Sequence, residues 1–240
     1  MPLDDALNTQ VATLNTELKH HAATDVLRRA LAAVPNLALV SSFGAESVAL
    51  LHLASRVKPD VQVIFIDTML LFPETLAYQR EVAKKLGLRR VKVVRADTAQ
   101  ADPDDTLHQR DTDACCTLRK TRVLEEALRG FDGWITGRKR YQSATRADLP
   151  AFEVEEATGR IKVNPLAHWT RDDVATYIEE NNLPRHPLVA QGYPSIGCAP
   201  CTSPVAAGED PRAGRWRGQD KDECGIHFVN GKMVRTGAKT

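Results

Sequence analysis

A strand, a turn and a helix follow one another in the stretch Leu37-Ala-Leu-Val-Ser-Ser-Phe-Gly-Ala-Glu-Ser47 and the residues behind it. Residues 37–40 form a short apolar run typical of a buried strand, and residues 48–57 carry apolar side chains at helical spacing. The turn between them offers backbone N–H groups at the beginning of a helix, where an anion is stabilised. An ordinary strand-to-helix turn with a serine cap is the plainer interpretation of this turn taken alone.

The same alternation continues along the chain. The strands and helices predicted next are, in chain order, 61–66, 74–86, 91–94, 118–128 and 134–136. Strands that alternate with helices predict an α/β fold, in which a parallel sheet is flanked by helices and binds its ligand at the carboxyl ends of the strands. We therefore expect the loops after Val40, Ile66 and Thr136 to line the site.

The two ends of the chain differ from this pattern. Residues 1–36 predict one or two peripheral helices, and a hairpin over 152–163 precedes a helix that begins at the capping box of Thr170 and Asp173. Beyond it, six of the thirteen prolines fall between residues 184 and 211. A long Pro-rich loop in a compact domain is usually functional or disordered, and its cysteines favour function.

Composition excludes several classes of protein. The 240 residues include 32 Lys and Arg against 31 Asp and Glu, so the net charge of +1 gives no general attraction to nucleic acid or to an anionic membrane. No apolar run approaches the ~20 residues that span a bilayer, and Asp4 and Asp5 do not fit a secretion signal. We expect a cytoplasmic protein without nucleic-acid or membrane partners, and a homo-oligomer stays open.

Five cysteines carry the strongest chemical signal: Cys115, Cys116, Cys198, Cys201 and Cys224. An odd number, in a chain without a secretion signal, argues against structural disulfides. The adjacent pair and the C-x-x-C motif suit zinc or a cubane iron–sulfur cluster. Neighbouring cysteines point about 100° apart on a helix, which suits a cubane better than one small tetrahedral ion. Buried or redox-paired thiols without a metal are the alternative.

Two further segments combine charge with reactivity. Cys224 lies in Lys221-Asp-Glu-Cys-Gly-Ile-His227, where nearby cations, including arginines 212, 215 and 217, can lower a thiol pKa or balance an anionic substrate. An exposed cysteine without a role is the alternative. The basic run Gly137-Arg-Lys-Arg-Tyr-Gln-Ser-Ala-Thr-Arg146 follows a predicted strand, and arginine forks match phosphate or sulfate oxygens. A solvated basic loop would look the same.

Together these motifs resemble the assimilatory sulfonucleotide reductases over about residues 37–227. The cysteine set is most similar to the thioredoxin-dependent adenylyl-sulfate (APS) reductases of the APS/PAPS reductase family. The most specific matches are Cys115-Cys116 with Arg119-Lys120, Gly192-Tyr-Pro-Ser-Ile-Gly-Cys-Ala-Pro-Cys201, and the segment from Gly214 to His227. Supporting matches are Ser42-Phe-Gly-Ala-Glu, the segment from Ile66 to Thr75, and Gln142-Ser-Ala-Thr-Arg146.

The resemblance implies an adenine-nucleotide α-hydrolase-like fold and a [4Fe-4S] cluster held by Cys115, Cys116, Cys198 and Cys201. It also implies that Cys224 attacks the sulfur of bound APS, that AMP leaves, and that reduced thioredoxin releases sulfite from the S-sulfocysteine. The implied division is a nucleotide- and cluster-binding α/β domain over 37–205 and a catalytic segment over 206–240.

Individual site residues follow from the same resemblance. Those implied near the reacting phosphosulfate are Lys120, Arg212, Arg215 and His227. Those implied to bind the rest of the substrate are Ser42, Phe43, Gly44, Asp67, Thr68, Arg140 and Arg146. The family's arginine pair before an acidic residue reads Lys139-Arg140-Tyr141 here, which leaves Lys139 and Tyr141 without an assigned role.

Three other functions stay open at this point. Reductases of 3′-phosphoadenylyl sulfate (PAPS) generally lack the four cluster cysteines, although some cluster-bearing relatives accept both substrates. An iron–sulfur ATP pyrophosphatase of the same superfamily would carry a Ser-Gly-Gly-x-Asp-Ser loop, which the turn at Ser42 does not. A redox-sensing protein would use the four cysteines without turnover and would not need Cys224.

Overall fold

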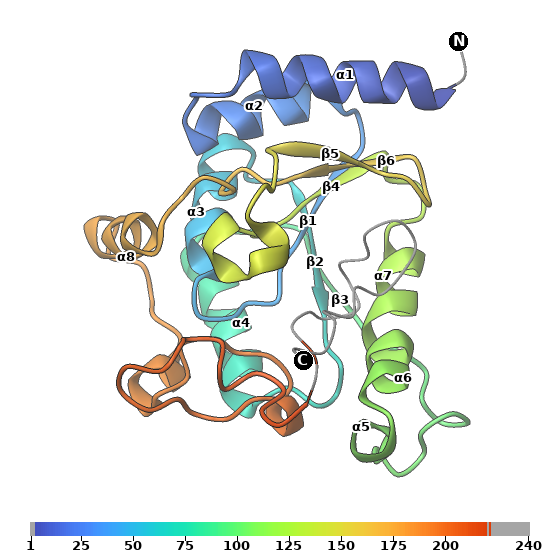
Figure 1. Ribbon diagram of the computed structural model, residues 1–240, viewed down its shortest axis with the longest axis vertical. Coiled ribbons are helices and arrows are strands. Elements are labelled where there is room, and N and C mark those ends of the chain that lie inside the picture. Colours follow the sequence, from blue (N-terminus) through green and yellow to red (C-terminus); the bar gives the residue numbers. More distant parts are fainter. Residues whose placement is uncertain (1–2, 220, 222–240) are drawn as a thin grey trace, which may run out of the picture.

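A six-stranded sheet forms the centre of the computed structural model, which describes residues 3–219 and 221 (Figure 1). Its strands lie in the order β3 (Val91–Val94), β2 (Gln62–Ile66), β1 (Leu37–Val40), β4 (Gly133–Ile135), β6 (Arg160–Val163) and β5 (Phe152–Glu155). All neighbouring strands pair in parallel except β5 and β6, which form the predicted hairpin. The predicted α/β fold is confirmed.

Alternate side chains of the central strands enter two separate hydrophobic clusters. Leu39 and Val63 belong to the larger cluster, whereas Ala38 and Ile64 belong to the smaller one. Both faces of the sheet are therefore buried, which explains why the strands read as continuous apolar runs. A side chain at Gly133 would collide with the backbone carbonyl of Ile161, so the close pairing of β4 with β6 requires glycine there.

Helices cover both faces of the sheet. The larger cluster contains side chains of α2 (Ala23–Ala33), α3 (Ser47–Val57), α4 (Pro73–Lys85) and α8 (Arg171–Glu180). The smaller cluster contains α7 (Arg122–Ala127), which Figure 1 shows across the strands from α3 and α4. This arrangement leaves the carboxyl ends of the strands uncovered by these helices.

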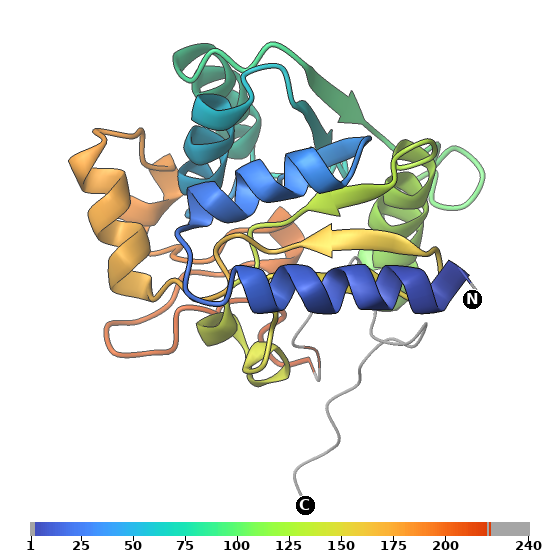
Figure 2. The same ribbon diagram turned by 90° about the horizontal axis from the view of Figure 1, so that it is seen from above.

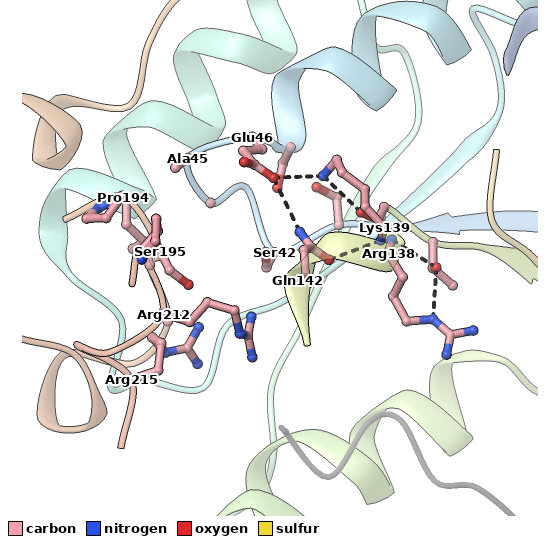
Figure 3. Close-up of a pocket in the computed structure, with 18 of the residues that line it drawn as sticks. Ser42, Ala45, Glu46, Arg138, Lys139, Gln142, Pro194, Ser195, Arg212 and Arg215 are labelled. Carbon is pink, nitrogen blue, oxygen red and sulfur yellow. Dashed lines mark hydrogen bonds and ion pairs between the residues drawn. The ribbon is translucent and has the colours of Figure 1, made fainter. Parts of the chain in front are cut away.

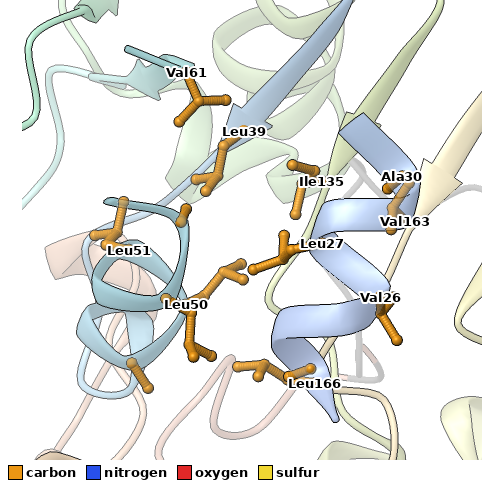
Figure 4. Packing of buried hydrophobic residues seen from close by; sticks show 14 of the residues in the cluster. Val26, Leu27, Ala30, Leu39, Leu50, Leu51, Val61, Ile135, Val163 and Leu166 are labelled. Carbon is orange, nitrogen blue, oxygen red and sulfur yellow. The ribbon is translucent and has the colours of Figure 1, made fainter. Parts of the chain in front are cut away.

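The N-terminal helices differ from the expected peripheral pair. Leu27 and Ala30 of α2 are fully buried, and Figure 4 shows Leu27 meeting Leu50 of α3 close to Ile135. Helix α1 (Leu3–Glu17) also contributes Val11 and Leu14 to the larger cluster, and it runs alongside the hairpin, where the Asn15 side chain bonds both backbone groups of Phe152 (Figure 2). Helix α2 is thus part of the core because its apolar stripe faces the sheet.

The helix predicted over 118–128 begins earlier in the structure. Asp111 caps it by accepting hydrogen bonds from the backbone N–H groups of Asp113 and Ala114, at 3.0 and 2.9 Å. A helical run then continues through α6 (Thr112–Cys116), a π-helical turn (Thr117–Thr121) and α7. The π turn breaks the 3.6-residue periodicity, so the apolar pattern could mark only the second half of the run.

The remaining predicted boundaries agree with the structure to within one residue, and the capping box of α8 is reproduced in full. Thr170 Oγ1 accepts from the Asp173 N–H at 3.1 Å, and the Asp173 carboxylate accepts from the Thr170 N–H at 2.7 Å.

Among residues 3–219 and 221, no helix is long and apolar enough to cross a membrane. Short helices also form at α5 (Leu107–Arg110) and at the 3₁₀ turns Arg140–Gln142, Ala144–Arg146, Pro187–Gln191 and Ala199–Cys201.

Candidate functional site

A pocket of about 320 Å³ opens at the carboxyl ends of β1, β2 and β4 (Figure 3). All three loops predicted to form the site line it, through residues such as Ser42, Thr68 and Gly137. Further parts of its wall come from residues 194–198, from five residues between 210 and 216, and from Lys120 and Arg171. The Pro-rich loop therefore completes a site that the sheet begins.

The loop after β1 is held by one aromatic side chain. Phe43 has a positive φ of 49°, and its buried ring packs edge-on against Phe65 with centroids 5.2 Å apart. The Ser41 hydroxyl stabilises this conformation by accepting the Phe43 N–H at 3.1 Å. Ser42 and Gly44 line the pocket, whereas the Phe43 side chain anchors the loop in the core and does not face a ligand as expected.

Gly44 brings this loop against the Pro-rich segment. A Cβ at this position would lie 3.3 Å from the Ile196 carbonyl oxygen and 3.4 Å from Ser42 Oγ. Contacts of this length leave little room for a side chain. Glycine therefore allows two walls of the pocket, which are about 150 residues apart in sequence, to approach closely.

Glu46 binds three polar side chains of the loop after β4: Lys139, Tyr141 and Gln142. Its carboxylate pairs with Lys139 Nζ at 2.9 Å (Figure 3). The same carboxylate accepts the Tyr141 hydroxyl at 2.7 Å. Burial alone raises the pKa of Glu46, but the Lys139 charge and the hydrogen bonds from Lys139, Tyr141 and Gln142 outweigh it and hold the pKa below its ordinary value. Lys139 and Tyr141, to which the sequence assigned no role, thus neutralise and orient one acid.

The other cations of this loop divide between the pocket and the protein interior. Arg146 is buried and lines the pocket, and Arg138 lines it while contacting Asn164 at 3.1 Å and Glu153. Arg140 is not among the lining residues, and its Nε donates to the Leu149 carbonyl at 2.9 Å. The structure thus places Arg146, but not Arg140, where the sequence expected both.

In the loop after β2, too, one expected site residue lines the pocket and its neighbour does not. Thr68 lines the pocket, and its hydroxyl lies 3.2 Å from Cys198 Sγ. Asp67 is buried beside it but does not line the pocket; its carboxylate accepts from the Met69 N–H at 2.9 Å and from Arg95 Nε at 2.8 Å. Asp67 therefore shapes the loop, while Thr68 faces the ligand space.

Four of the five cysteines lie within the described residues. Cys115, Cys116 and Cys198 are buried, Cys201 is half-buried, and none of the four forms a disulfide. Burial raises the pKa of the Cys115 thiol, Cys198 and Cys201 add to the rise, and Arg119 and Lys120 oppose it. The two cysteine segments are therefore close enough to interact electrostatically. Within the described residues, however, no three His, Cys, Asp or Glu side chains surround a single metal-ion position.

The two cations after the cysteine pair face different partners. Arg119 is 1% exposed and donates to the Thr68 carbonyl at 2.9 Å, to Asp102 at 2.6 Å and to Asp105 at 2.5 Å. Lys120, the next residue, lines the pocket. The π-helical turn that carries both residues thus supplies one cation to the framework and one to the site.

The C-terminal part of the described chain adds two arginines. Arg212 and Arg215 line the pocket together, and Figure 3 shows them across it from Arg138. The Arg215 guanidinium lies over the Trp216 ring, 4.4 Å from its centroid. The predicted nucleophile Cys224 and its neighbour His227 lie outside the described residues.

Sequence reasoning missed several lining or supporting residues, among them Glu46, Arg138, Gln142, Arg171 and Trp216. Arg138 and Gln142 lie inside the basic run that the sequence singled out, and a signal existed for Glu46 because an acid inside a loop suited to anions needs a cationic partner. The cations of the pocket, combined with apolar residues such as Leu50 and Ile66, suit a ligand that joins an apolar ring to anionic groups.

Comparison with known proteins identifies the family. Residues 36–204 match the phosphoadenosine phosphosulfate reductase domain. An adenosine 5′-phosphosulfate reductase of Mesorhizobium japonicum is 45% identical over 240 residues, covering 98% of this chain and 94% of its own. A phosphoadenosine 5′-phosphosulfate reductase of Gloeobacter violaceus is 43% identical over 197 residues, covering 80% and 82%.

A solved structure agrees with these sequence matches. The phosphoadenylyl-sulfate reductase of Candida auris, determined as a phosphate complex, has a TM-score of 0.71 and 32% identity, and the match covers 81% of this chain and 96% of the other. The domain match spans the sheet, the loops after β1, β2 and β4, and all four described cysteines. This chain belongs to the phosphoadenosine phosphosulfate reductase family.

Proposed function

We propose that this protein reduces adenylyl sulfate to sulfite and AMP in assimilatory sulfate reduction. The observation that carries the proposal is the pocket at the carboxyl ends of β1, β2 and β4, in which cations from three remote segments converge beside the cysteines. The names of the relatives from Mesorhizobium and other bacteria favour the same activity.

The pocket residues divide the work of binding. The loop of Ser42 and Gly44 presents backbone N–H groups and a hydroxyl to phosphate oxygens. Lys120, Arg212 and Arg215 neutralise the charge that develops on the phosphate as it leaves the sulfur. Positioned cations help this step most because the transferred group and the leaving group are both anionic.

The proposed chemistry begins at Cys224. Its thiolate attacks the sulfur of adenylyl sulfate, a bond forms between the two sulfur atoms, and the sulfur–oxygen bond breaks with its electron pair passing to AMP. One thiolate of reduced thioredoxin then attacks Cys224, sulfite leaves, and the second thioredoxin thiol restores the free Cys224. Two electrons from the dithiol balance the reduction. Reduced thioredoxin and a free thiol nucleophile both suit the cytoplasm.

We further propose that Cys115, Cys116, Cys198 and Cys201 hold a [4Fe-4S] cluster. The donor set fits such a group: the thiols form no disulfide, three are buried, and the charges of the two segments act on one another. Arg119 and Lys120 would offset the negative charge of a thiolate-bound cluster. When bound, the cluster would supply a local electrostatic field that tunes Lys120.

A contact between the two proposed parts of the chain supports their division. Lys221 Nζ lies 2.5 Å from Asp113 Oδ1 and 3.5 Å from Cys116 Sγ. Cys224 follows Lys221 by three residues. Lys221 would thus attach the proposed catalytic segment, 206–240, to the cysteine-bearing helix of the α/β domain, 37–205.

The test is the intact mass of anaerobically purified protein incubated with adenylyl sulfate, or with its 3′-phosphorylated form, in the absence of thioredoxin. A sulfonate adduct that maps to Cys224, is absent from Cys224→Ser and disappears with reduced thioredoxin is the expected result. Stronger labelling by the 3′-phosphorylated nucleotide would favour the activity named for the Gloeobacter relative. No adduct from protein that holds its cluster would refute the reductase and favour the ATP-consuming or redox-sensing alternatives.

A further inference from the structure

Arg146 lies at the pocket wall close to another buried cation. It is 8% exposed in the 3₁₀ turn Ala144–Arg146, and it lies close enough to the buried Lys139 ammonium for the two positive charges to repel. Arginine also has a long side chain with many rotamers, so it needs specific contacts to stay in one position. Its neighbours therefore decide whether it stays at the pocket wall.

Gln142 is one of these neighbours. Arg146 NH1 donates to Gln142 Oε1 at 2.5 Å, and the same oxygen accepts the backbone N–H of Lys139 at 3.1 Å. The other end of the amide, Nε2, donates to Glu46 at 3.3 Å (Figure 3). The reverse orientation would turn the NH₂ group toward two donors, so the network itself selects this one.

Glu46 supports Arg146 in two ways. Its carboxylate neutralises Lys139, which reduces the repulsion that Arg146 meets. It also accepts the Gln142 amide, which turns the amide oxygen toward the guanidinium. Glu46 and Gln142 are 96 residues apart and belong to loops after the adjacent strands β1 and β4.

We propose that Gln142, held in orientation by Glu46, is a positioning residue that aims Arg146 at the anionic groups of the bound nucleotide. The inference rests on the proposed function, because it assumes that a nucleotide occupies the pocket. If the inference is correct, Gln142 affects the binding of charged ligands, through Arg146, and leaves the shape of the pocket unchanged.

The test is a double-mutant cycle of Gln142→Met and Arg146→Met, read as the affinity of the cluster-loaded protein for AMP and for adenosine by calorimetry. Gln142→Met keeps the length of the side chain and removes its three hydrogen bonds, to Arg146, Lys139 and Glu46. We expect roughly tenfold weaker AMP binding, the loss typical of a hydrogen bond to a charged group, and less than a twofold change for adenosine. In the Arg146→Met background, Gln142→Met should change AMP binding by less than about twofold.

The matched control is Gln109→Met, because Gln109 is exposed on α5 and is not a pocket residue. If Gln142→Met unfolds, Gln142→Asn keeps the amide but is too short to contact both Glu46 and Arg146. Equal losses for AMP and adenosine, or full additivity of the two substitutions, would overturn the inference. Wild-type protein that binds neither ligand would refute the proposed function and, with it, this inference; wild-type binding with an unaffected Gln142→Met would refute the inference alone.

Discussion

The buried ion pair between Glu46 and Lys139 offers a direct test of the energetics of the site. The change is Glu46→Gln, which keeps the shape of the side chain and removes its charge. Lys139 is 3% exposed in the pair and would then carry a charge without a counter-ion in the interior. Burial already lowers the pKa of Lys139, and Arg146 lowers it further, while Glu46 opposes both effects.

The magnitude follows from these burials. Breaking a buried pair by removing one partner costs about 3–5 kcal/mol, and because the Glu46 side chain remains 28% exposed we take the lower value, about 3 kcal/mol. For a chain of this size the melting temperature should fall by about 6–12 °C. Urea unfolding followed by circular dichroism measures the free energy, and Glu125→Gln, an exposed position on α7, is the control.

A double-mutant cycle identifies the pair as the cause. Lys139→Met removes the buried charge, so Glu46→Gln should cost much less in that background. The pH dependence has a definite sign. The folded-state pKa of Glu46 lies below its ordinary 4.5, so its contribution is complete above pH 4.5 and is lost as the pH falls through the folded-state value. A loss below about 1 kcal/mol at pH 7, or additive single variants, would refute the reasoning.

Three other substitutions test different parts of the structure. Gly197→Ala would place its Cβ 2.6 Å from Arg215 Cζ, so the guanidinium should move and AMP binding should weaken roughly tenfold with the melting temperature nearly unchanged; unchanged binding would contradict this. Arg119→Met leaves the buried Asp102 carboxylate without its partner and should lower stability by about 3 kcal/mol in urea unfolding, with partial recovery in Arg119→Lys. Burial lowers the pKa of His186 to about 4, against a weaker opposing effect of Glu74, so the unfolded chain binds a proton below pH 6.5 that the folded chain does not. Wild-type stability should therefore fall between pH 6.5 and 4, and His186→Asn should flatten that part of the pH profile of the urea midpoint.

The stretch after Leu37 predicted the fold correctly because its signals are local. Strand, turn and helix each depend on residues within about ten positions, and their repetition predicts a parallel sheet with its site at the carboxyl ends of the strands. The pocket lies there, between the loops that follow Val40, Ile66 and Thr136. The first residue of the helix predicted over 118–128 was wrong for the same reason, because the π turn interrupts the local helical periodicity on which the prediction depends.

The part played by each side chain depends on contacts between distant residues. Arg119 and Lys120 are neighbours in sequence, yet one binds Asp102 in the framework and the other lines the pocket. Nothing local distinguishes them, because the two directions are set by the π turn and by the loop that carries Asp102. The same holds for Phe43, whose ring is drawn into the core by Phe65 rather than toward a ligand.

The sequence by itself determined the fold class, the edge of the sheet that binds the ligand, and the residue types that gather there. Only the tertiary structure decided which charges face the ligand and which neutralise one another, as Glu46 and Lys139 do from positions 93 residues apart. The physical reason is that patterning is read one element at a time, whereas a buried charge must find its partner among whatever segments packing brings beside it.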